Sequence, residues 1–450
     1  MNLRKILLLL LIMSLLATSL VSCGDKNDNA RENLPTKTLN VYNWGEYISD
    51  EDDPESGLID VNAAFEEYFN ENLASEYGYY VRVNYSTYAT NEDMYAKIKN
   101  SAVSYDIIIP SDYMIEKMIS ENLLKPIDKS KLENYSNINE SFLDPYYDPD
   151  SQYSVPYTYG MLGIIYNSEF VKDEPDVERE SWDLLWNPKY AGKILQFNNP
   201  RDAFATAMYK EGLDINSTDP EVWNQALTYL QEQKPLLQGY VNDEIFNKMK
   251  GASAYIAPYY AGDFLTMAAA NDDLRFYYPD EGTNYFVDAM CIPVTSDEEK
   301  YDLAIAYIDF MISEKAATAN ALYIGYASPN NKVTGSKYYA DMLSANYDTE
   351  YISAWDILYG KTVDEVNEKY PYDTAAYKDY YKDDTIDIQS HVISLWETLK
   401  TQNSTEPWIH VTSIAIVVGV ISLATHSTYT KKKRSRDYRL RDKMKQQNKK

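Results

Sequence analysis

The stretch Leu39-Asn-Val-Tyr-Asn-Trp-Gly-Glu-Tyr47 sets the interpretation of the whole chain. Its apolar first half predicts a short buried strand. Directly after that strand, Trp44, Glu46 and Tyr47 bring an indole, a carboxylate and a phenol together. Ligands of open α/β sheets bind at the carboxyl ends of strands, and aromatic faces attract cations. These three residues are therefore candidate ligand contacts, although both aromatics would also suit ordinary core packing near a turn.

Strands and helices alternate beyond this stretch. Helical spacing covers 58–69 and 91–98, and strand patterns cover 79–86 and 105–109. This order predicts a mainly parallel, doubly wound α/β sheet, because a helix carries the chain from one parallel strand to the next.

A second alternating set follows the polar, Pro-containing segment 129–150. It opens with two predicted strands, 153–157 and 162–166. A later strand at 193–197 leads into Asn198-Asn199-Pro200, a sequence that predicts a capped helix with proline at its first position. The length of 450 residues is in keeping with two or three domains.

The charge of the chain is strongly asymmetric. Of its 42 basic side chains, 11 lie in the tail 431–450 and two in the leader, which leaves 29 basic and 67 acidic side chains over 24–430, a net charge of −38 there. Such a surface repels nucleic acid and attracts cations. No nucleic-acid partner is expected.

Histidine and cysteine are too scarce for most chemistry based on them. Among the three histidines, only His391 lies outside the C-terminal apolar segment and its surroundings, and Cys23 and Cys291 form no disulfide framework. The main domain therefore has too few histidines for a histidine-based metal site, and His391 is its single candidate for a Ser-His-Asp triad. We expect no catalytic residues, no metal and no cofactor.

The N-terminus carries an export signal. Residues 1–22 hold two basic residues, an apolar run and small residues, and Leu20-Val-Ser-Cys-Gly24 resembles the bacterial lipoprotein signal. That resemblance implies a lipid on Cys23, whereas a plain signal peptide would leave none. Residues 23–38 are expected to form a polar tether.

The C-terminus carries a second membrane signal. Residues 408–425 are apolar, near the minimum length for crossing a bilayer, and the basic segment 426–450 follows. The positive-inside rule predicts a transmembrane helix with this tail in the cytoplasm. A buried C-terminal helix is the alternative. The main domain is thus expected at the extracytoplasmic face of the cell membrane, held at both ends.

Several motifs occur in the same order as in a known family. Tyr105-Asp-Ile-Ile-Ile-Pro-Ser-Asp-Tyr113 and Asp288-Ala-Met-Cys-Ile-Pro293 resemble the spermidine/putrescine-binding proteins of bacterial ABC importers, as do segments 41–47, 85–88, 91–99, 126–132, 156–157, 200–203 and 324–330. The resemblance covers roughly 39–399. It implies a two-lobed, type II periplasmic-binding-protein fold with a hinge, an α/β sheet in each lobe and a ligand between them. The implied lobes are 39–154 with 287–335, and 155–286 with 336–402.

The resemblance also implies the ligand contacts, which are Trp44, Tyr47, Ser111, Tyr113, Asp202, Tyr259, Phe286, Asp288 and Tyr326. Asp288 and Asp202 would pair with ammonium groups, with Glu46 and Asp263 in reserve, and the aromatics would cover the methylenes. Asn199 stands where family members that bind spermidine tightly have a carboxylate. Tyr259 and Phe286 stand in place of tryptophans. The preferred polyamine therefore stays open.

The sequence thus predicts a polyamine-binding component that delivers its ligand to ABC permease subunits. One alternative is a ferric-iron-binding protein of the same fold class, in which Tyr259 and Tyr260 would supply two phenolate oxygens. An extracytoplasmic carboxylate-pair hydrolase and a tethered adhesin are further alternatives, and no local motif supports the hydrolase.

Overall fold

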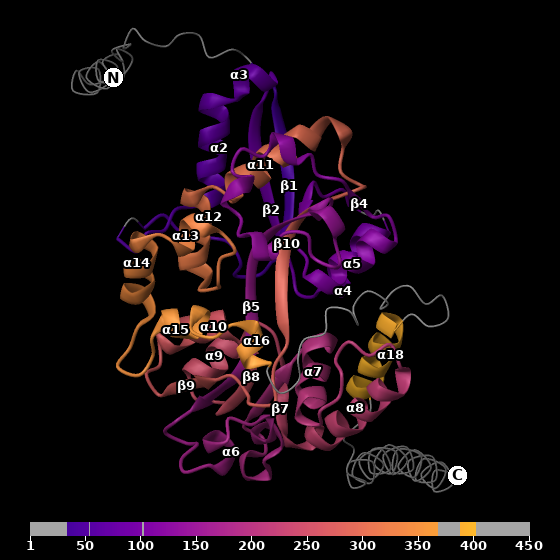
Figure 1. Ribbon diagram of the computed structural model, residues 1–450, viewed down its shortest axis with the longest axis vertical. Helices are drawn as coiled ribbons and strands as arrows, with labels where there is room; N and C mark the ends of the chain where they lie inside the picture. The colour runs from indigo at the N-terminus through magenta and orange to yellow at the C-terminus, as the bar shows by residue number, and fades with distance from the viewer. Residues whose placement is uncertain (1–33, 54, 101–102, 368–387, 402–450) are drawn as a thin grey trace, which may run out of the picture.

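The computed structural model describes residues 34–53, 55–100, 103–367 and 388–401 as two α/β lobes joined by two long strands (Figure 1). The two-lobed fold expected from the sequence is confirmed. Within those ranges, no helix is both long enough and apolar enough to cross a bilayer. The predicted export signal with Cys23, the predicted transmembrane helix and the basic tail all lie outside the described residues.

The first lobe is built on a parallel sheet with an antiparallel edge. Strand β1 (Thr36–Trp44) pairs in parallel with β2 (Tyr80–Tyr88) over its whole length, and also with β3 (Ile107–Ile108). Strand β10 (Tyr285–Pro293) runs antiparallel to β3 and to β4 (Leu124–Lys125). The opening stretch of the sequence is therefore the central strand of its lobe, and Trp44 ends it.

The helices of this lobe begin where the sequence offers caps. Asp60 accepts a hydrogen bond from the Ala63 backbone N–H, and Thr90 accepts one from that of Asp93. The helices around this sheet are α2 (Val61–Asn72), α3 (Ala74–Tyr77), α4 (Asn91–Lys99), α5 (Asp112–Ser120), α11 (Tyr301–Met311), α12 (Glu314–Ile324) and α13 (Asn331–Thr334).

Strand β5 (Ser154–Asn167) carries the chain from the first lobe into the second. The prediction of two strands at 153–157 and 162–166 is wrong, because Gly160 does not break the strand. A Cβ at Gly160 would lie 2.9 Å from the Phe286 ring, so this glycine makes room for an aromatic side chain. The first half of β5 pairs antiparallel with β10, and the second half pairs with strands of the second lobe.

The second lobe combines parallel and antiparallel pairs. Strand β6 (Ile194–Phe197) is parallel to β7 (Leu237–Val241) and β8 (Ile256–Tyr260), whereas β5 is antiparallel to β8 and to β9 (Leu274–Tyr277). The mainly parallel sheet that the sequence predicts is therefore interrupted at β5 and β10. These two strands cross between the lobes in opposite directions and so cannot join a parallel ladder.

The remaining helices cover the second lobe and one side of the junction. They are α6 (Pro175–Glu178), α7 (Pro200–Lys210), α8 (Pro220–Gln233), α9 (Glu244–Lys250), α10 (Ala261–Ala268), α14 (Lys337–Tyr347), α15 (Ala354–Tyr359), α16 (Val363–Val366) and α18 (Ile388–Thr401). Short 3₁₀ turns are η1 (Lys129–Lys131), η2 (Tyr135–Asn137), η3 (Glu140–Phe142), η4 (Pro149–Ser151), η5 (Trp182–Trp186), η6 (Pro188–Tyr190), η7 (Lys234–Leu236) and η8 (Glu298–Lys300).

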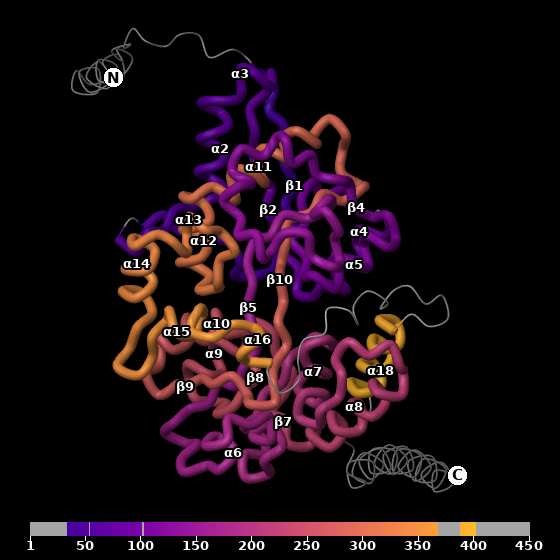
Figure 2. The backbone as a smooth tube through the Cα atoms, viewed as in Figure 1, coloured from indigo at the N-terminus to yellow at the C-terminus, as the bar shows by residue number. Residues whose placement is uncertain are grey.

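Within the described residues, the chain passes between the lobes along β5, β10 and α14 (Figure 2). It descends along β5, returns along β10, and descends again through α14, which contacts α12 above and α10 below. Helix α18 then packs on α7 and α8 of the second lobe. Strands β5 and β10 include the predicted crossing points after residues 154 and 286. The lobe boundaries themselves stay a prediction.

Candidate ligand-binding cleft

A cleft lies at the junction of the two lobes, with a volume of about 1050 Å³ that includes its open mouth. Its walls come from the loop after β1, the start of α5, the start of α7, the end of β8, α10, β10 and the loop after α12. It brings together all twelve residues singled out in the sequence, which are Trp44, Glu46, Tyr47, Ser111, Tyr113, Asn199, Asp202, Tyr259, Asp263, Phe286, Asp288 and Tyr326. Their role as ligand contacts stays a prediction.

Asp288 lies on β10, one of the two strands that join the lobes, and is only 3% exposed. Its Oδ2 accepts a hydrogen bond of 2.6 Å from the Tyr47 hydroxyl, but its Oδ1 is buried without a donor among the described residues. The Ser111 hydroxyl is close enough to affect the pKa but does not form a hydrogen bond with Oδ1. Burial raises the pKa of Asp288 to about 7, while the Ser111 and Tyr47 hydroxyls lower it.

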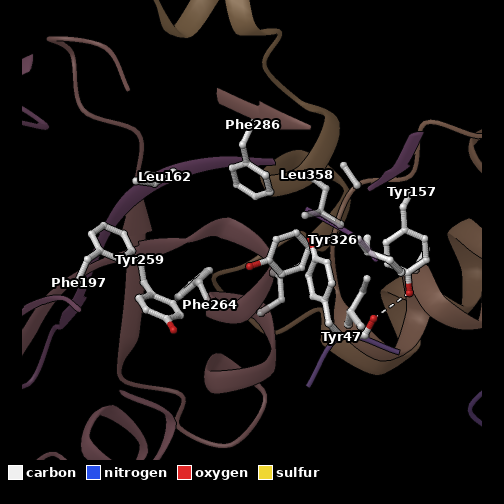
Figure 3. Packing of buried hydrophobic residues seen from close by; sticks show 14 of the residues in the cluster. Tyr47, Tyr157, Leu162, Phe197, Tyr259, Phe264, Phe286, Tyr326 and Leu358 are labelled. Atoms are coloured by element: carbon white, nitrogen blue, oxygen red, sulfur yellow. Dashed lines mark hydrogen bonds between the residues drawn. The ribbon is translucent and has the colours of Figure 1, made fainter. Parts of the chain in front are cut away.

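Tyr47 is held at both ends. Its hydroxyl lies 2.6 Å from Thr158 Oγ1 as well as from Asp288, and its backbone carbonyl accepts a hydrogen bond of 2.8 Å from the Tyr157 hydroxyl. Figure 3 shows the bond from Tyr157, and it shows the rings of Tyr47 and Tyr326 next to each other in an edge-to-face arrangement. Burial raises the pKa of Tyr47 well above its usual range, so this phenol stays neutral and can donate.

Asp202 has no such free oxygen, because its carboxylate already accepts three hydrogen bonds. Asn199 Nδ2 and the Tyr260 hydroxyl donate to Oδ2 at 2.7 and 2.5 Å, and Asn284 Nδ2 donates to Oδ1 at 2.8 Å. Asn199 also accepts from the Asp202 backbone N–H, which confirms the predicted helix cap. In this structure Asn199 therefore acts as a cap and a donor to Asp202.

A second group of acids lies around Asp263 of α10. Its Oδ2 accepts a hydrogen bond of 2.9 Å from the Tyr326 hydroxyl. Burial raises the pKa of Asp263 to about 8, and the negative charges of Asp243 and Glu46 raise it further. Glu46 belongs to the loop after β1 and Asp243 to the turn before α9, so both lobes contribute acids here.

Sequence reasoning missed three charged residues of the cleft, Asp112, Arg201 and Asp243. Asp112 accepts hydrogen bonds from the backbone N–H groups of Tyr113 and Val287, at 2.7 and 3.2 Å. Burial raises its pKa to about 6, and the positive charge of Arg201 opposes that rise. The available signal was the position of the two acids at the starts of helices, which also suits helix capping and so does not by itself indicate a cleft.

Arg201 does not offset the acidity of the cleft. Six carboxylates line the cleft, whereas Arg201 is the single Lys or Arg among the described lining residues. Its guanidinium donates to the Ile215 carbonyl at 2.7 Å and to Asn216 Oδ1 at 2.9 Å, and it lies 6.0 Å from the Tyr113 ring centre. The Tyr113 hydroxyl in turn donates to Glu92 at 3.0 Å. The cleft is built for positive charge.

An aromatic wall accompanies these acids. The Tyr260 and Phe286 rings lie 5.4 Å apart, those of Phe286 and Tyr326 6.0 Å, and those of Tyr326 and Tyr47 5.2 Å (Figure 3 labels three of the four). Besides burial, Asp202 and Asp263 both raise the pKa of Tyr260, so this wall lies near both groups of acids. Flat rings between acids suit a molecule with methylenes between charged ends.

The same wall bears on the ferric-iron alternative. Burial raises the pKa of both Tyr259 and Tyr260 well above the usual range, which disfavours the phenolate form that binds a hard cation. The Tyr260 hydroxyl also donates a hydrogen bond to Asp202, which needs the phenol to keep its proton. The pair is therefore poorly prepared to ligate iron, and this alternative is not favoured.

Gly262 and Gly325 lie where α10 of the second lobe meets the end of α12 of the first. A Cβ at Gly262 would lie 2.3 Å from the Tyr326 ring and 2.8 Å from the Gly325 carbonyl, and one at Gly325 would lie 3.0 Å from the Gly262 carbonyl. The two lobes thus touch backbone to backbone beside the cleft, an approach that only glycine allows.

Comparison with known proteins agrees with this architecture. A family model described as bacterial extracellular solute-binding protein matches residues 103–353, and one for hypothetical lipoproteins of the MG045 family matches 57–144. The spermidine/putrescine-binding periplasmic protein of Escherichia coli K12 is 30% identical over 369 residues, which cover 82% of this chain and 96% of that protein.

Solved structures give the same result. A spermidine/putrescine ABC transporter protein of Listeria monocytogenes is 31% identical with a TM-score of 0.66, over 81% of this chain and 99% of that one. The spermidine/putrescine substrate-binding protein of Streptococcus pneumoniae, solved with calcium and HEPES, is 30% identical with a TM-score of 0.56, over 81% and 98%. This chain therefore belongs to the bacterial extracellular solute-binding protein family.

Proposed function

We propose that this protein is the extracytoplasmic substrate-binding component of an ABC importer and that it captures a polyamine, spermidine or putrescine, in its cleft. The observation that carries the proposal is the free Oδ1 of Asp288, a buried carboxylate oxygen without a donor in the described structure. A buried acceptor left unpaired is costly, and a buried ammonium is costly too. A hydrogen bond between a ligand ammonium and Oδ1 of Asp288 would remove both costs. The names of the relatives in E. coli, Listeria and Streptococcus support the same ligand class.

The cleft offers two places for ammonium groups. Asp288 would pair with one, and Asp263, with Asp243 and Glu46 beside it, would pair with another. Methylenes between them would lie on the aromatic wall, where each cation–π contact adds roughly 0.5–2 kcal/mol. Asp202 is better placed to support the wall than to bind the ligand, because its oxygens already accept from three donors.

The two-lobed architecture suits capture followed by release. The cleft is lined from both lobes, so a ligand bound in it would favour the closed arrangement. We expect ABC permease subunits to accept the ligand when the lobes part. The residues named here act in binding, and we assign no catalytic role, metal or cofactor to any of them.

Membrane attachment at both ends is part of the proposal. It rests on the sequence: the lipoprotein signal ending at Cys23, and the apolar segment 408–425 before the basic tail 426–450. The match of 57–144 to a hypothetical lipoprotein family supports the lipid anchor. Metabolic labelling with a fatty acid should mark the protein and should fail in Cys23→Ala. Protease added to right-side-out vesicles should leave the tail intact.

The binding proposal is tested by calorimetry on the full-length protein in detergent. Putrescine, cadaverine, spermidine and spermine are titrated in turn, with butylamine as a monoamine control. A ligand at one hundred times its Kd should also stabilise the fold by about 2.7 kcal/mol in thermal unfolding. Absence of binding for all four polyamines would contradict the proposed function.

A further inference from the structure

Thr158 lies behind the cleft and lines none of it. It is 2% exposed, belongs to the hinge strand β5, and faces a small separate cavity with Tyr157 and Asn320. Its Oγ1 is 2.6 Å from the Tyr47 hydroxyl oxygen, and that oxygen is 2.6 Å from Asp288 Oδ2. Three side chains thus form an unbroken chain of short contacts from the hinge to the candidate ligand anchor.

The direction of this chain follows from the number of protons. Tyr47 has a single hydroxyl proton, and an ionised Asp288 can only accept, so the proton lies between Tyr47 and Oδ2. The Tyr47 oxygen then accepts, and Thr158 must be the donor to it. Two linked hydrogen bonds in the same direction polarise one another, which makes Tyr47 a stronger donor.

A β-bulge brings the supporting residues to Tyr47. Asp288 pairs with Thr158, but the next residue, Ala289, pairs with Pro156, so Tyr157 is the extra residue of β5. Bulges redirect side chains, and here two consecutive residues both reach Tyr47. Tyr157 holds its carbonyl, as Figure 3 shows, and Thr158 holds its hydroxyl.

We propose that Thr158 is a positioning residue for cation capture: its hydroxyl fixes the Tyr47 proton on Oδ2 of Asp288 and so leaves Oδ1 as the acceptor for the ligand. This inference rests on the proposed function. Thr158 touches no ligand, and its effect passes through Tyr47. The β-bulge in β5 thereby affects the protonation of Asp288 through Thr158 and Tyr47.

Several other groups face Asp288 and must be kept constant in any test. Ser111 at the start of α5 lowers its pKa, and the negative charges of Asp112 on α5 and Asp202 on α7 raise it. Arg201 beside Asp112 adds a positive charge to the same wall. Loss of the Thr158 donor weakens the Tyr47 hydrogen bond and should raise the pKa of Asp288, because that bond favours the ionised form.

The test replaces Thr158 by valine, which has nearly the same shape but no hydroxyl. Carbon-13 NMR follows the Asp288 carboxyl in the ligand-free full-length protein, with Asp288→Asn to assign the signal, and calorimetry follows putrescine affinity against pH. In Thr158→Val the Asp288 midpoint should rise by about half a pH unit. Putrescine affinity should fall about threefold near pH 6.5 and stay unchanged near pH 8.5, where the carboxyl is ionised in both proteins.

Control variants separate positioning from packing. Thr158→Ser keeps the hydroxyl and should restore both the midpoint and the affinity. Thr318→Val makes the same change at another buried threonine, on α12 outside the cleft, and should alter neither. If Thr158→Val does not fold, Thr158→Ala removes the same donor with less bulk.

Two results would overturn the inference: an unmoved Asp288 midpoint, or an affinity loss that is equal at every pH. Each would mean that Thr158 serves packing only. If the wild-type protein binds none of the amines, the proposed function fails. The ligand-free titration still decides whether Thr158 fixes the Tyr47 proton, so the two failures are distinguishable.

Discussion

The β10 wall and the α7 wall of the cleft each carry a buried aspartate, and the two differ in how many hydrogen bonds they accept. Asp288 on β10 accepts one hydrogen bond through Oδ2 and keeps Oδ1 free, whereas Asp202 on α7 accepts three and has neither oxygen free. Both are acids at motif positions of the same family. The difference teaches that the acceptor capacity a buried carboxylate keeps open to the cleft depends on neighbours far away in the sequence.

The largest effect should come from Asp288→Asn. The substitution keeps the shape but removes the charge that pairs with the buried ammonium, and it turns an N–H donor toward the ligand. Truncating one side of a buried charge pair costs about 2–5 kcal/mol, so putrescine affinity should fall about a hundredfold. Calorimetry at one pH measures this loss. Affinity within about threefold of wild type would show that Oδ1 of Asp288 is not the anchor.

The pH dependence of binding should be nearly as large. Burial raises the pKa of Asp288 to about 7 and that of Asp263 to about 8, so both bind protons in the ligand-free cleft near pH 6. A cation favours their ionised forms, and putrescine affinity should rise at least about tenfold between pH 6 and 8.5. Below pH 8, calorimetry in buffers of different ionisation enthalpy should detect proton release on binding. A flat profile would contradict free carboxyls in the cleft.

The stability of the ligand-free protein should change with the opposite sign. Over about pH 4 to 8 the folded state binds more protons at Asp288 and Asp263 than the unfolded chain, whose carboxyls are already ionised there. Stability from these groups is therefore lost as pH rises through the folded-state pKa values. Chemical denaturation with and without putrescine distinguishes this effect from binding, since the ligand should offset the loss.

A smaller and more selective effect is expected for Asp263→Asn. Asp263 is less buried than Asp288 and keeps two other acids nearby, so putrescine affinity should fall about fivefold. Butylamine has no second ammonium and should lose nothing. The ratio of diamine to monoamine affinity, measured in both proteins, isolates the contact with the second ammonium. An equal loss for both ligands would place Asp263 outside that contact.

The smallest effect on affinity is expected for Asp202→Asn, and it is the sharpest test of the comparison. Because the Asp202 oxygens are already occupied, putrescine affinity should change by less than about threefold. The free energy of unfolding should fall by about 1–3 kcal/mol, since the amide N–H group of the new side chain would face groups that donate to Asp202 in the wild type. Thermal unfolding measures the second quantity. A large affinity loss with an unchanged melting temperature would instead make Asp202 a direct ligand contact.

The positions that form the cleft were predictable because they follow strands. Trp44 ends β1, Ser111 follows β3, and Asn199 follows β6, and the carboxyl ends of strands are where such sheets bind ligands. The hydrogen bonds of the cleft side chains were not predictable. Asp202 accepts hydrogen bonds from Tyr260 and Asn284, which are distant in sequence, and no local sequence pattern predicts such partners.

The error in β5 had a similar origin. The sequence predicts two strands, 153–157 and 162–166, but the strand continues through Gly160, which accommodates Phe286 from the antiparallel partner strand. Asp112 and Asp243 do lie at helix starts, and both also line the cleft. In each case a tertiary neighbour decided the role of a residue whose local propensity pointed elsewhere.

Gly262 and Gly325 limit how bulky a side chain can be where the two lobes meet. A methyl group at Gly262 would clash with the Tyr326 ring and the Gly325 carbonyl of the opposite lobe. Gly262→Ala should therefore prevent the two lobes from coming as close as they do here. In such a variant the two lobes should stay further apart, and under the proposed function a bound ligand should dissociate faster. Under the proposed function, the variant would be a starting scaffold for an optical polyamine sensor with a fast response.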